Sequence, residues 1–157
     1  MMEKEQFCHK IRDLETSMYR YALGVLKSPA DAEDAVGETV LKAYAHLAQL
    51  KAPEHFRSWA MSILVNVTRT MLTCRKRLEL SGDMSLYEQP SSGEHRELWY
   101  AVMDLPQDFR QVVILYYYEG FRTKEIALMM KRSEGTVKSR LNRARQKLKT
   151  ALEDRNR

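Results

Sequence analysis

The sequence has only two cysteines, Cys8 and Cys74, among its 157 residues. They stand far apart and match no metal-binding or redox spacing, so we expect two reduced thiols without a special role. Its four histidines are scattered, and no pair of them has metal-ligand spacing. A glycine-rich phosphate loop is missing as well. These absences argue against an enzyme, and we expect no catalytic residue, no metal and no cofactor.

Long apolar runs are also missing. No segment approaches the ~20 apolar residues that a membrane span needs. The first ten residues, MMEKEQFCHK, are charged and lack the apolar core of a signal peptide. We therefore expect a cytoplasmic protein, and a chain of this length is long enough to bury one core or two small ones.

Positive charge is concentrated toward the C-terminus. Residues 98–157 hold 13 basic and seven acidic side chains, whereas residues 81–97 hold one basic and four acidic ones. The net charge of +5 hides this division. A basic segment of this kind favours a polyanionic partner.

Apolar residues in the first half recur at spacings of three and four, which predicts helices with one buried face. Ser28-Pro29 and Pro53 mark the breaks, and Asp31 is the predicted cap of the second helix. The predicted buried stripes are Phe7, Ile11, Leu14, Met18, Tyr21 and Val25; Val36, Val40, Ala43, Tyr44 and Leu47; and Phe56, Trp59, Ile63, Val67 and Met71. Trp59 could also serve as a stacking platform for bases, but its place in the stripe favours the core.

The segment 81–95 holds Gly, Ser, Pro and acidic residues without periodicity, and it predicts a flexible linker. We therefore predict an all-α protein with two small helical domains, residues 1–80 and 96–157. Leu98, Val102 and Leu105 indicate a short helix that stops at Pro106. The stretch QDFRQVVILYYYEG indicates another, which Gly120 closes.

Two further helices are predicted around a tight turn at Ser133 and Gly135. Thr123 is the predicted cap of the first, which buries Ile126, Ala127 and Met130. The second buries Val137, Leu141, Ala144 and Leu148 and turns a basic, amide-bearing face outward. This pattern is typical of a helix-turn-helix, in which Arg, Lys, Asn and Gln contact base edges or phosphates. A solvated helix face is the alternative, but it would need neither the small-residue turn nor the preceding helix.

Four stretches in this order resemble the extracytoplasmic-function (ECF) group of bacterial RNA polymerase sigma factors. They are DAEDAVGETVLKAYAHL, HFRSWAMSILVNVTR, LPQDFRQVVILYYYEGFRTKEIA and SEGTVKSRLNRARQKL. The resemblance implies a sigma region 2, a sigma region 4 and no catalytic chemistry. It also implies core RNA polymerase and promoter DNA as partners, and a separate anti-sigma factor as regulator.

In region 2, the resemblance implies that Asp34, Glu38 and Lys42 bind the β′ clamp helices of the polymerase. It also implies that Lys51, Arg57, Asn66 and Arg69 contact the −10 element, with Asn66 facing a base turned out of the stack and Arg75, Lys76 and Arg77 continuing the basic surface. The chain departs from the family pattern at Gly37, where Gln is usual, and at Leu50 and Thr70.

In region 4, the resemblance implies that the −35 element is read as duplex. The residues that match base contacts are Lys138, Ser139, Asn142 and Arg143, and those that match phosphate contacts are Thr136 and Arg140. The apolar face around Val112, Val113 and Tyr116 is expected in the core and against the β flap. Lys131 and Arg132 depart from the usual Gly and apolar residue of the turn.

Two other function classes compete with this interpretation. A helix-turn-helix regulator that binds duplex DNA by itself accounts for residues 120–150 but leaves FRSWAMSILVN unexplained. An enzyme has no motif in its favour. Transcription in vitro with core polymerase separates the three, because only a sigma factor makes core polymerase initiate at a defined promoter.

Overall fold

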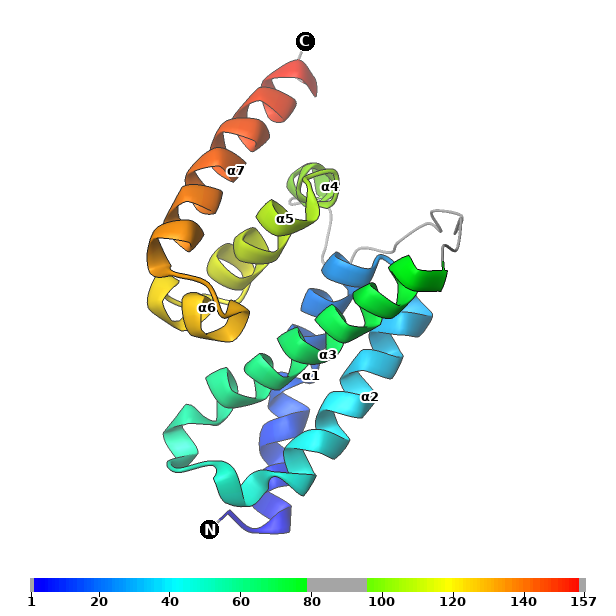
Figure 1. Ribbon diagram of the computed structural model, residues 1–157, viewed down its shortest axis with the longest axis vertical. Helices are drawn as coiled ribbons and strands as arrows, with labels where there is room; N and C mark the ends of the chain where they lie inside the picture. Colours follow the sequence, from blue (N-terminus) through cyan, green and yellow to red (C-terminus); the bar gives the residue numbers. More distant parts are fainter. Residues whose placement is uncertain (1, 79–95, 156–157) are drawn as a thin grey trace. The chain divides into compact units, whose positions relative to one another are not determined.

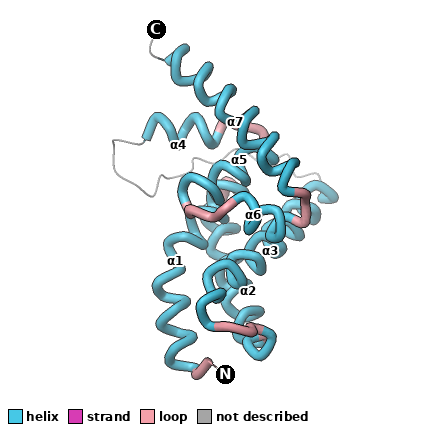
Figure 2. The backbone as a smooth tube through the Cα atoms, turned by 90° about the vertical axis from the view of Figure 1, so that its left-hand side faces the viewer, coloured by secondary structure: helices cyan, strands magenta, loops and turns pink. Residues whose placement is uncertain are grey.

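The computed structural model describes residues 2–78 and 96–155. The chain divides into two compact units, Met1–Leu86 and Tyr87–Arg157. Within the described residues every element is a helix and no strand occurs (Figure 2), which confirms the predicted all-α fold. The predicted linker, residues 81–95, lies outside the described residues.

The first unit contains three long helices, α1 (Lys4–Leu26), α2 (Pro29–Ala45) and α3 (Phe56–Leu78), each of which packs against the other two (Figure 1). Two short 3-10 turns, η1 (Leu47–Gln49) and η2 (Pro53–His55), connect α2 to α3. The predicted stripe of α1, from Phe7 to Val25, is buried along its whole length. This regular stripe gives α1 one continuous apolar face against both neighbours.

The buried face of α2 differs from the predicted one. Its buried residues are Ala32, Ala35, Thr39 and Ala43. Of the predicted stripe, Ala43 and the following Leu47 are buried, Val36 and Val40 are half-buried, and Tyr44 is 50% exposed. The Thr39 hydroxyl donates to the carbonyl of Ala35 at 2.8 Å, so its polar atom is satisfied inside the bundle. Side chains this small present a low ridge to α1 and α3, and the larger apolar residues of α2 are left outside.

The buried arc of α3 is also displaced from its predicted stripe. Phe56 and Val67 are buried, whereas Trp59, Ile63 and Met71 are half-buried. Of the residues 56–76, whose burial the structure describes, the other buried ones are Ala60, Met61, Leu64, Val65 and Thr68. Because α3 packs against two helices, its buried arc is wider than a single stripe. Trp59 lies at the edge of this arc, with its ring centroid 5.9 Å from that of Phe56.

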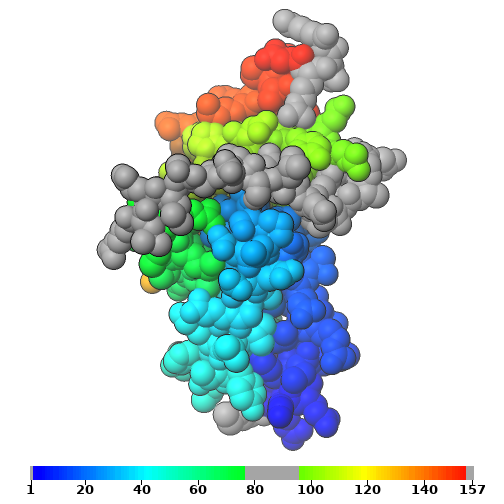
Figure 3. All heavy atoms as spheres, turned by 90° about the vertical axis from the view of Figure 1, so that its right-hand side faces the viewer, coloured from blue at the N-terminus to red at the C-terminus, as the bar shows by residue number. Residues whose placement is uncertain are grey.

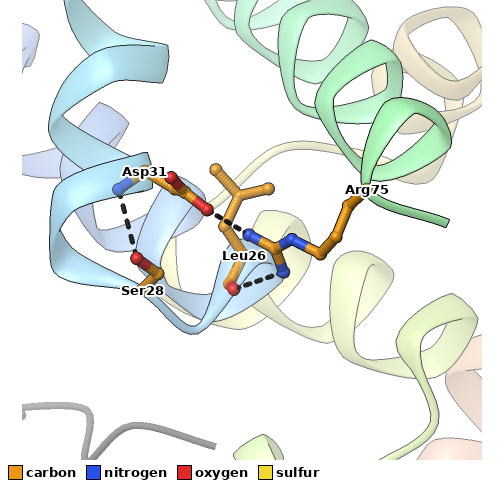
Figure 4. Close-up of polar contacts among 4 residues, drawn as sticks. All are labelled: Leu26, Ser28, Asp31 and Arg75. Carbon is orange, nitrogen blue, oxygen red and sulfur yellow. Dashed lines mark hydrogen bonds and ion pairs between the residues drawn. The ribbon is translucent and has the colours of Figure 1, made fainter. Parts of the chain in front are cut away.

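The corner between α1 and α2 is closed by polar contacts (Figure 4). Ser28, not the predicted Asp31, is the N-cap of α2, because its hydroxyl accepts the backbone N–H of Asp31 at 3.2 Å, and Pro29 occupies the first helical position. The Asp31 carboxylate is therefore available to Arg75 near the end of α3, which donates to it. Arg75 also donates to the carbonyl of Leu26 at 2.9 Å. One side chain of α3 thus joins the end of α1 to the start of α2.

The second unit begins with α4 (Arg96–Met103) and α5 (Gln107–Val113), which continues into a π-helical turn, η4 (Ile114–Tyr118). Val112 and Val113 are buried, as predicted, and so are Ile114 and Leu115 of the π-helical turn, whereas Tyr116 is half-buried. Gly120 ends the segment with a φ of +75°, a conformation that favours glycine. The Arg110 side chain is buried and donates to the carbonyl of Leu105 at 2.8 Å, beyond the end of α4. This bond ties the corner between α4 and α5.

Candidate nucleic-acid interface

The helix-turn-helix consists of α6 (Thr123–Met130) and α7 (Glu134–Arg155). Lys131 ends α6 in the left-handed conformation, with a φ of +56°, and the N–H of Arg132 bonds the carbonyl of Ala127 at 3.0 Å. This is the hydrogen-bond pattern of a Schellman turn. Ser133 then caps α7 by accepting the N–H of Thr136 at 3.1 Å. The turn thus keeps the usual geometry although Lys131 replaces the glycine that such a position favours.

Thr123 has a different role from the predicted one. The start of α6 is capped from within the helix, because the Glu125 carboxylate accepts the backbone N–H of Arg122 at 2.9 Å. The Thr123 hydroxyl instead donates to the carboxylate of Glu134 at 2.7 Å, in the first turn of α7. This contact links the starts of the two helices across the turn. The interaction spans 11 residues, so local cap patterns gave no signal for it.

The faces of α7 agree with the sequence. Val137, Leu141, Ala144 and Leu148 are buried against the rest of the unit, as predicted. The predicted base-contacting residues are exposed: Lys138, Ser139, Asn142 and Arg143. Because residues three and four apart share a face of a helix, Ser139, Asn142 and Arg143 form one surface that points away from the buried stripe. We call these three residues the outer face of α7.

The two predicted phosphate contacts are less open. The Arg140 side chain is only 18% exposed, and its guanidinium lies 3.9 Å from the carboxylate of Asp108 in α5. The hydroxyl of Thr136, which is half-buried, lies 2.9 Å from that of Ser133. Arg140 therefore joins α7 to α5 and offers only a small part of its charge to solvent.

Arg145 was not predicted as part of the site. Its guanidinium donates a hydrogen bond to the Tyr117 hydroxyl and lies 5.9 Å and 5.6 Å from the ring centroids of Tyr116 and Tyr117. Such distances are those of cation–π contacts. A pocket of about 370 Å³ lies beside this cluster, and its lining includes Arg122, Lys138 and Arg145. The signal in the sequence was the spacing of seven residues between Lys138 and Arg145, which puts both on one flank of α7.

In the first unit, the structure brings together only part of the predicted −10 surface. Asn66 is exposed on α3, and its side-chain oxygen accepts a hydrogen bond from Arg69 at 3.2 Å. Arg57 lies nine residues before Asn66, which is about half a turn away around the helix. Arg57 lines a pocket together with Lys10 and Asp13 of α1. Lys51 is exposed between η1 and η2.

Of the predicted basic tail of α3, the structure describes the side chains of Arg75 and Lys76. The Arg75 guanidinium contacts Leu26 and Asp31, as described above, and is only 34% exposed. Lys76 is exposed, and the side chain of Arg77 lies outside the described residues. Arg75 therefore belongs to the packing of the unit more than to a surface for DNA.

Asp34, Glu38 and Lys42 are all exposed and follow one another at four-residue spacing along α2. Figure 3 shows this helix, in light blue to cyan, at the surface of the first unit. The exposed apolar residues Leu41 and Tyr44, at 73% and 50%, lie on the same helix. We call these five residues the outer face of α2. Its mixture of charge and large apolar side chains is typical of a surface that binds protein.

Metal chemistry finds no support in the described residues. Among residues 2–78 and 96–155, no three His, Cys, Asp or Glu side chains come together in an arrangement that could hold an ion. No helix of that part of the chain is both long and apolar enough to span a bilayer.

Comparison with known proteins gives one family for both units. The family profile "Sigma-70 region 2" matches residues 11–78, and "Sigma-70, region 4" matches residues 95–148. The chain is 34% identical over 143 residues to the ECF RNA polymerase sigma factor EcfG of Rhodopseudomonas palustris, covering 87% of this chain and 79% of EcfG. It is 31% identical over 139 residues to the sigma factor SigV of Bacillus subtilis, covering 85% of this chain and 83% of SigV. A probable sigma factor of Xanthomonas campestris, RfaY, is 32% identical over 145 residues, which are 83% of this chain but 36% of RfaY.

Two solved structures are similar. The sigma factor RpoE of Bartonella quintana, in complex with the anti-sigma factor NepR, matches with a TM-score of 0.80 and 25% identity, covering 95% of this chain and 98% of RpoE. CnrH in complex with the cytosolic domain of CnrY matches with a TM-score of 0.68 and 22% identity, covering 97% of this chain and 90% of CnrH; this second likeness concerns the fold alone. Sigma factors bind core RNA polymerase and promoter DNA and direct promoter-specific initiation of transcription. With both regions present, the chain belongs to the sigma-70 family of RNA polymerase sigma factors, in its ECF group.

Proposed function

We propose that the outer face of α7 reads the −35 element in the major groove, with Lys138 beside it. The single observation that carries this proposal is the exposure of Ser139, Asn142 and Arg143 on one face of a helix whose opposite face is buried. Arg binds guanine edges and Asn binds adenine edges by paired hydrogen bonds, and Ser suits either. Thr136 and Arg140 contact phosphates at the margin of this surface. Because Asp108 already holds Arg140, its phosphate contact is the weaker of the two.

Holoenzyme assembled from the full chain and core polymerase tests this proposal on promoter fragments randomised at the −35 positions. We expect the wild type to select a defined sequence and the Asn142→Ala variant to lose selection at one position. Equal retention of every −35 sequence by the wild type would reject the proposed reading surface.

Asn66 and Arg69 form the proposed centre of the −10 surface. A flipped base needs a polar partner for its hydrogen-bonding edge, and the strand needs positive charge. The exposed Asn66 amide supplies the first and Arg69, which already contacts it, supplies the second. Arg57, half a turn from Asn66 around α3, and Lys51, in the connection before α3, would hold phosphates of the strand away from the flipped base.

The outer face of α2 is the proposed contact with the β′ clamp helices. Asp34 and Glu38 give it negative charge and Lys42 a positive one, and Leu41 and Tyr44 supply apolar area beside them. The β flap is the proposed second contact, made by the part of the second unit around Val112, Val113 and Tyr116. Because Val112 and Val113 are buried, Tyr116, which is half-buried, offers the larger accessible surface.

We also propose the boundaries 1–80 and 96–157 for the two domains, with 81–95 as the linker, a cytoplasmic location and control by an anti-sigma factor. The complex of the similar RpoE with NepR supports the last of these. Separate expression of residues 1–80 and 96–157 tests the boundaries. We expect both fragments to give helical circular dichroism spectra and cooperative unfolding, whereas loss of helix in both would argue for a single shared core.

A further inference from the structure

Glu134 occupies an unexpected place for an acidic residue in a surface that binds DNA. It opens α7, the proposed reading helix, and its carboxylate oxygen Oε2 lies 3.7 Å from the ammonium nitrogen of Lys138, one turn further on. The same oxygen accepts the hydrogen bond from the Thr123 hydroxyl at 2.7 Å. One oxygen thus receives a donor from α6 and faces a cation from α7.

The contact with Thr123 fixes the carboxylate. A glutamate side chain at the start of a helix ordinarily moves among several rotamers, but a short hydrogen bond from the neighbouring helix selects one of them. The Thr123 hydroxyl, followed by the charges of Lys138 and Lys124, lowers the pKa of the Glu134 carboxyl. Glu134 therefore carries its negative charge in the unbound protein.

The contact with Glu134 changes what Lys138 can do. A free lysine binds any phosphate as a point charge and adds affinity for every DNA sequence. When its charge is balanced by a fixed carboxylate, this sequence-independent gain is reduced. The ammonium has three donors, so those that do not face Glu134 are still able to reach acceptors on a base edge. The Lys138 side chain is 65% exposed, which leaves room for that contact.

We propose that Glu134, held by Thr123, is a specificity-determining positioning residue that suppresses binding of Lys138 to arbitrary phosphates and aims its ammonium at one base pair of the −35 element. This proposal rests on the reading role of α7 proposed above. It assigns the α6–α7 contact a function in DNA discrimination beyond joining the two helices.

The test compares Glu134→Gln with the wild type, using the full chain with random-sequence 30-base-pair duplex and holoenzyme with promoter fragments randomised at the −35 positions. Glutamine keeps the size of the side chain and removes its charge. We expect tighter binding to the random-sequence duplex and a plot of log affinity against log salt that is steeper by about one unit, since one more lysine displaces a counterion. Selection at one −35 base pair should fall about fivefold or more. Thr123→Val, which removes only the hydroxyl, should change the affinity for random-sequence duplex, the salt slope and the selection in the same directions as Glu134→Gln, by smaller amounts.

Two controls separate this effect from a general loss of negative charge. Glu153→Gln removes one exposed acid from the same helix and should leave selection unchanged. Lys138→Met should abolish the effect of Glu134→Gln on both the salt slope and selection. The proposal is overturned if Glu134→Gln behaves like Glu153→Gln, or if it weakens all duplexes equally. A wild type that selects no −35 sequence would refute the reading role instead, and the salt slopes on random-sequence duplex would still report whether Glu134 restrains Lys138.

Discussion

The carboxylate of Asp31 accepts a hydrogen bond from the guanidinium of Arg75, 44 residues later in the chain. The pair joins the first turn of α2 to the last turns of α3, and the carbonyl of Leu26 at the end of α1 completes the contact. Both side chains keep about a third of their surface exposed, so water weakens the ion pair. Arg75 thus connects α3 to both α1 and α2 through hydrogen bonds.

Replacing Arg75 with Met tests how much these hydrogen bonds stabilise the first unit. Methionine keeps the apolar stem but removes both hydrogen bonds, so the free energy of unfolding should fall by about 1–2 kcal/mol. Urea titration followed by circular dichroism gives the value. The neighbouring Lys76, which is exposed, provides the control, and Lys76→Ala should change stability by less than about 0.5 kcal/mol. Equal effects of the two substitutions would show that Arg75 adds nothing beyond its charge.

Gly37 offers a second test of stability. It lies on the exposed side of α2, and an added Cβ would meet no atom within 4 Å. Gly37→Ala should therefore stabilise the first unit by about 0.5–1 kcal/mol, because alanine loses less backbone freedom in a helix. Gly120→Ala is the matched opposite, since its φ of +75° strains any other residue, and it should destabilise the second unit. A loss of stability in Gly37→Ala, measured by urea titration, would mean that α2 needs a glycine there for a reason other than space.

Reversing the charge of Asp34 and Glu38 to Lys should weaken binding to core polymerase and leave unfolding nearly unchanged, because both side chains are exposed. Fluorescence titration of labelled chain with core polymerase measures the affinity. The charge-matched control reverses both Glu5 and Glu15 to Lys, at exposed positions of α1. If this control weakens binding as much as the reversal of Asp34 and Glu38 does, net charge and not the outer face of α2 governs the contact.

Reading and opening should separate at Arg143 and Asn66. Arg143→Ala should cost about 1–3 kcal/mol of −35 affinity if Arg143 makes a paired base contact, and it should relax selection at one position. Asn66→Ala should spare −35 binding and reduce opening of the −10 element, because the flipped base loses its polar partner. Permanganate reactivity of thymines reports opening, and duplex titration reports −35 binding. Normal opening by Asn66→Ala, with opening lost in Arg143→Ala even on a template already unpaired at −10, would reverse the two assignments.

The sequence predicted helices best where one long apolar stripe recurs without interruption. The stripes of α1 and α7 are buried as predicted, because a helix that packs one face onto a core must repeat its apolar residues every three or four positions. The predicted stripe of α2 was only partly correct: Ala43 and Leu47 are buried, but Tyr44 is exposed and the small residues Ala32 and Ala35 are buried instead. Alanine differs little in hydrophobicity from its polar neighbours, so the buried alanine face of α2 gave a weak signal in the sequence. The larger apolar residues on the exposed face gave a stronger signal and were assigned to the core instead.

Contacts between distant residues escaped prediction. Asp31, the predicted cap of α2, bonds Arg75 of α3 instead, and Ser28 is the cap. The hydroxyl of Thr123, the predicted cap of α6, donates instead to Glu134, 11 residues later in the chain. The predicted −35 residues lie on the outer face of α7 or at its margin, since helical spacing fixes their direction. The predicted −10 residues do not form one surface, because Arg57 and Asn66 lie on opposite sides of α3.

Small residues of α2 are buried and its largest apolar residues are exposed, and this arrangement affects the surface of the chain before it binds a partner. A helix that turns alanine inward and Leu41 and Tyr44 outward keeps its largest apolar surface in water until another molecule covers it. The exposed parts of these side chains therefore contribute no hydrophobic stabilisation to the folded unit. Asp34, Glu38 and Lys42 place charge beside this apolar surface in the unbound chain.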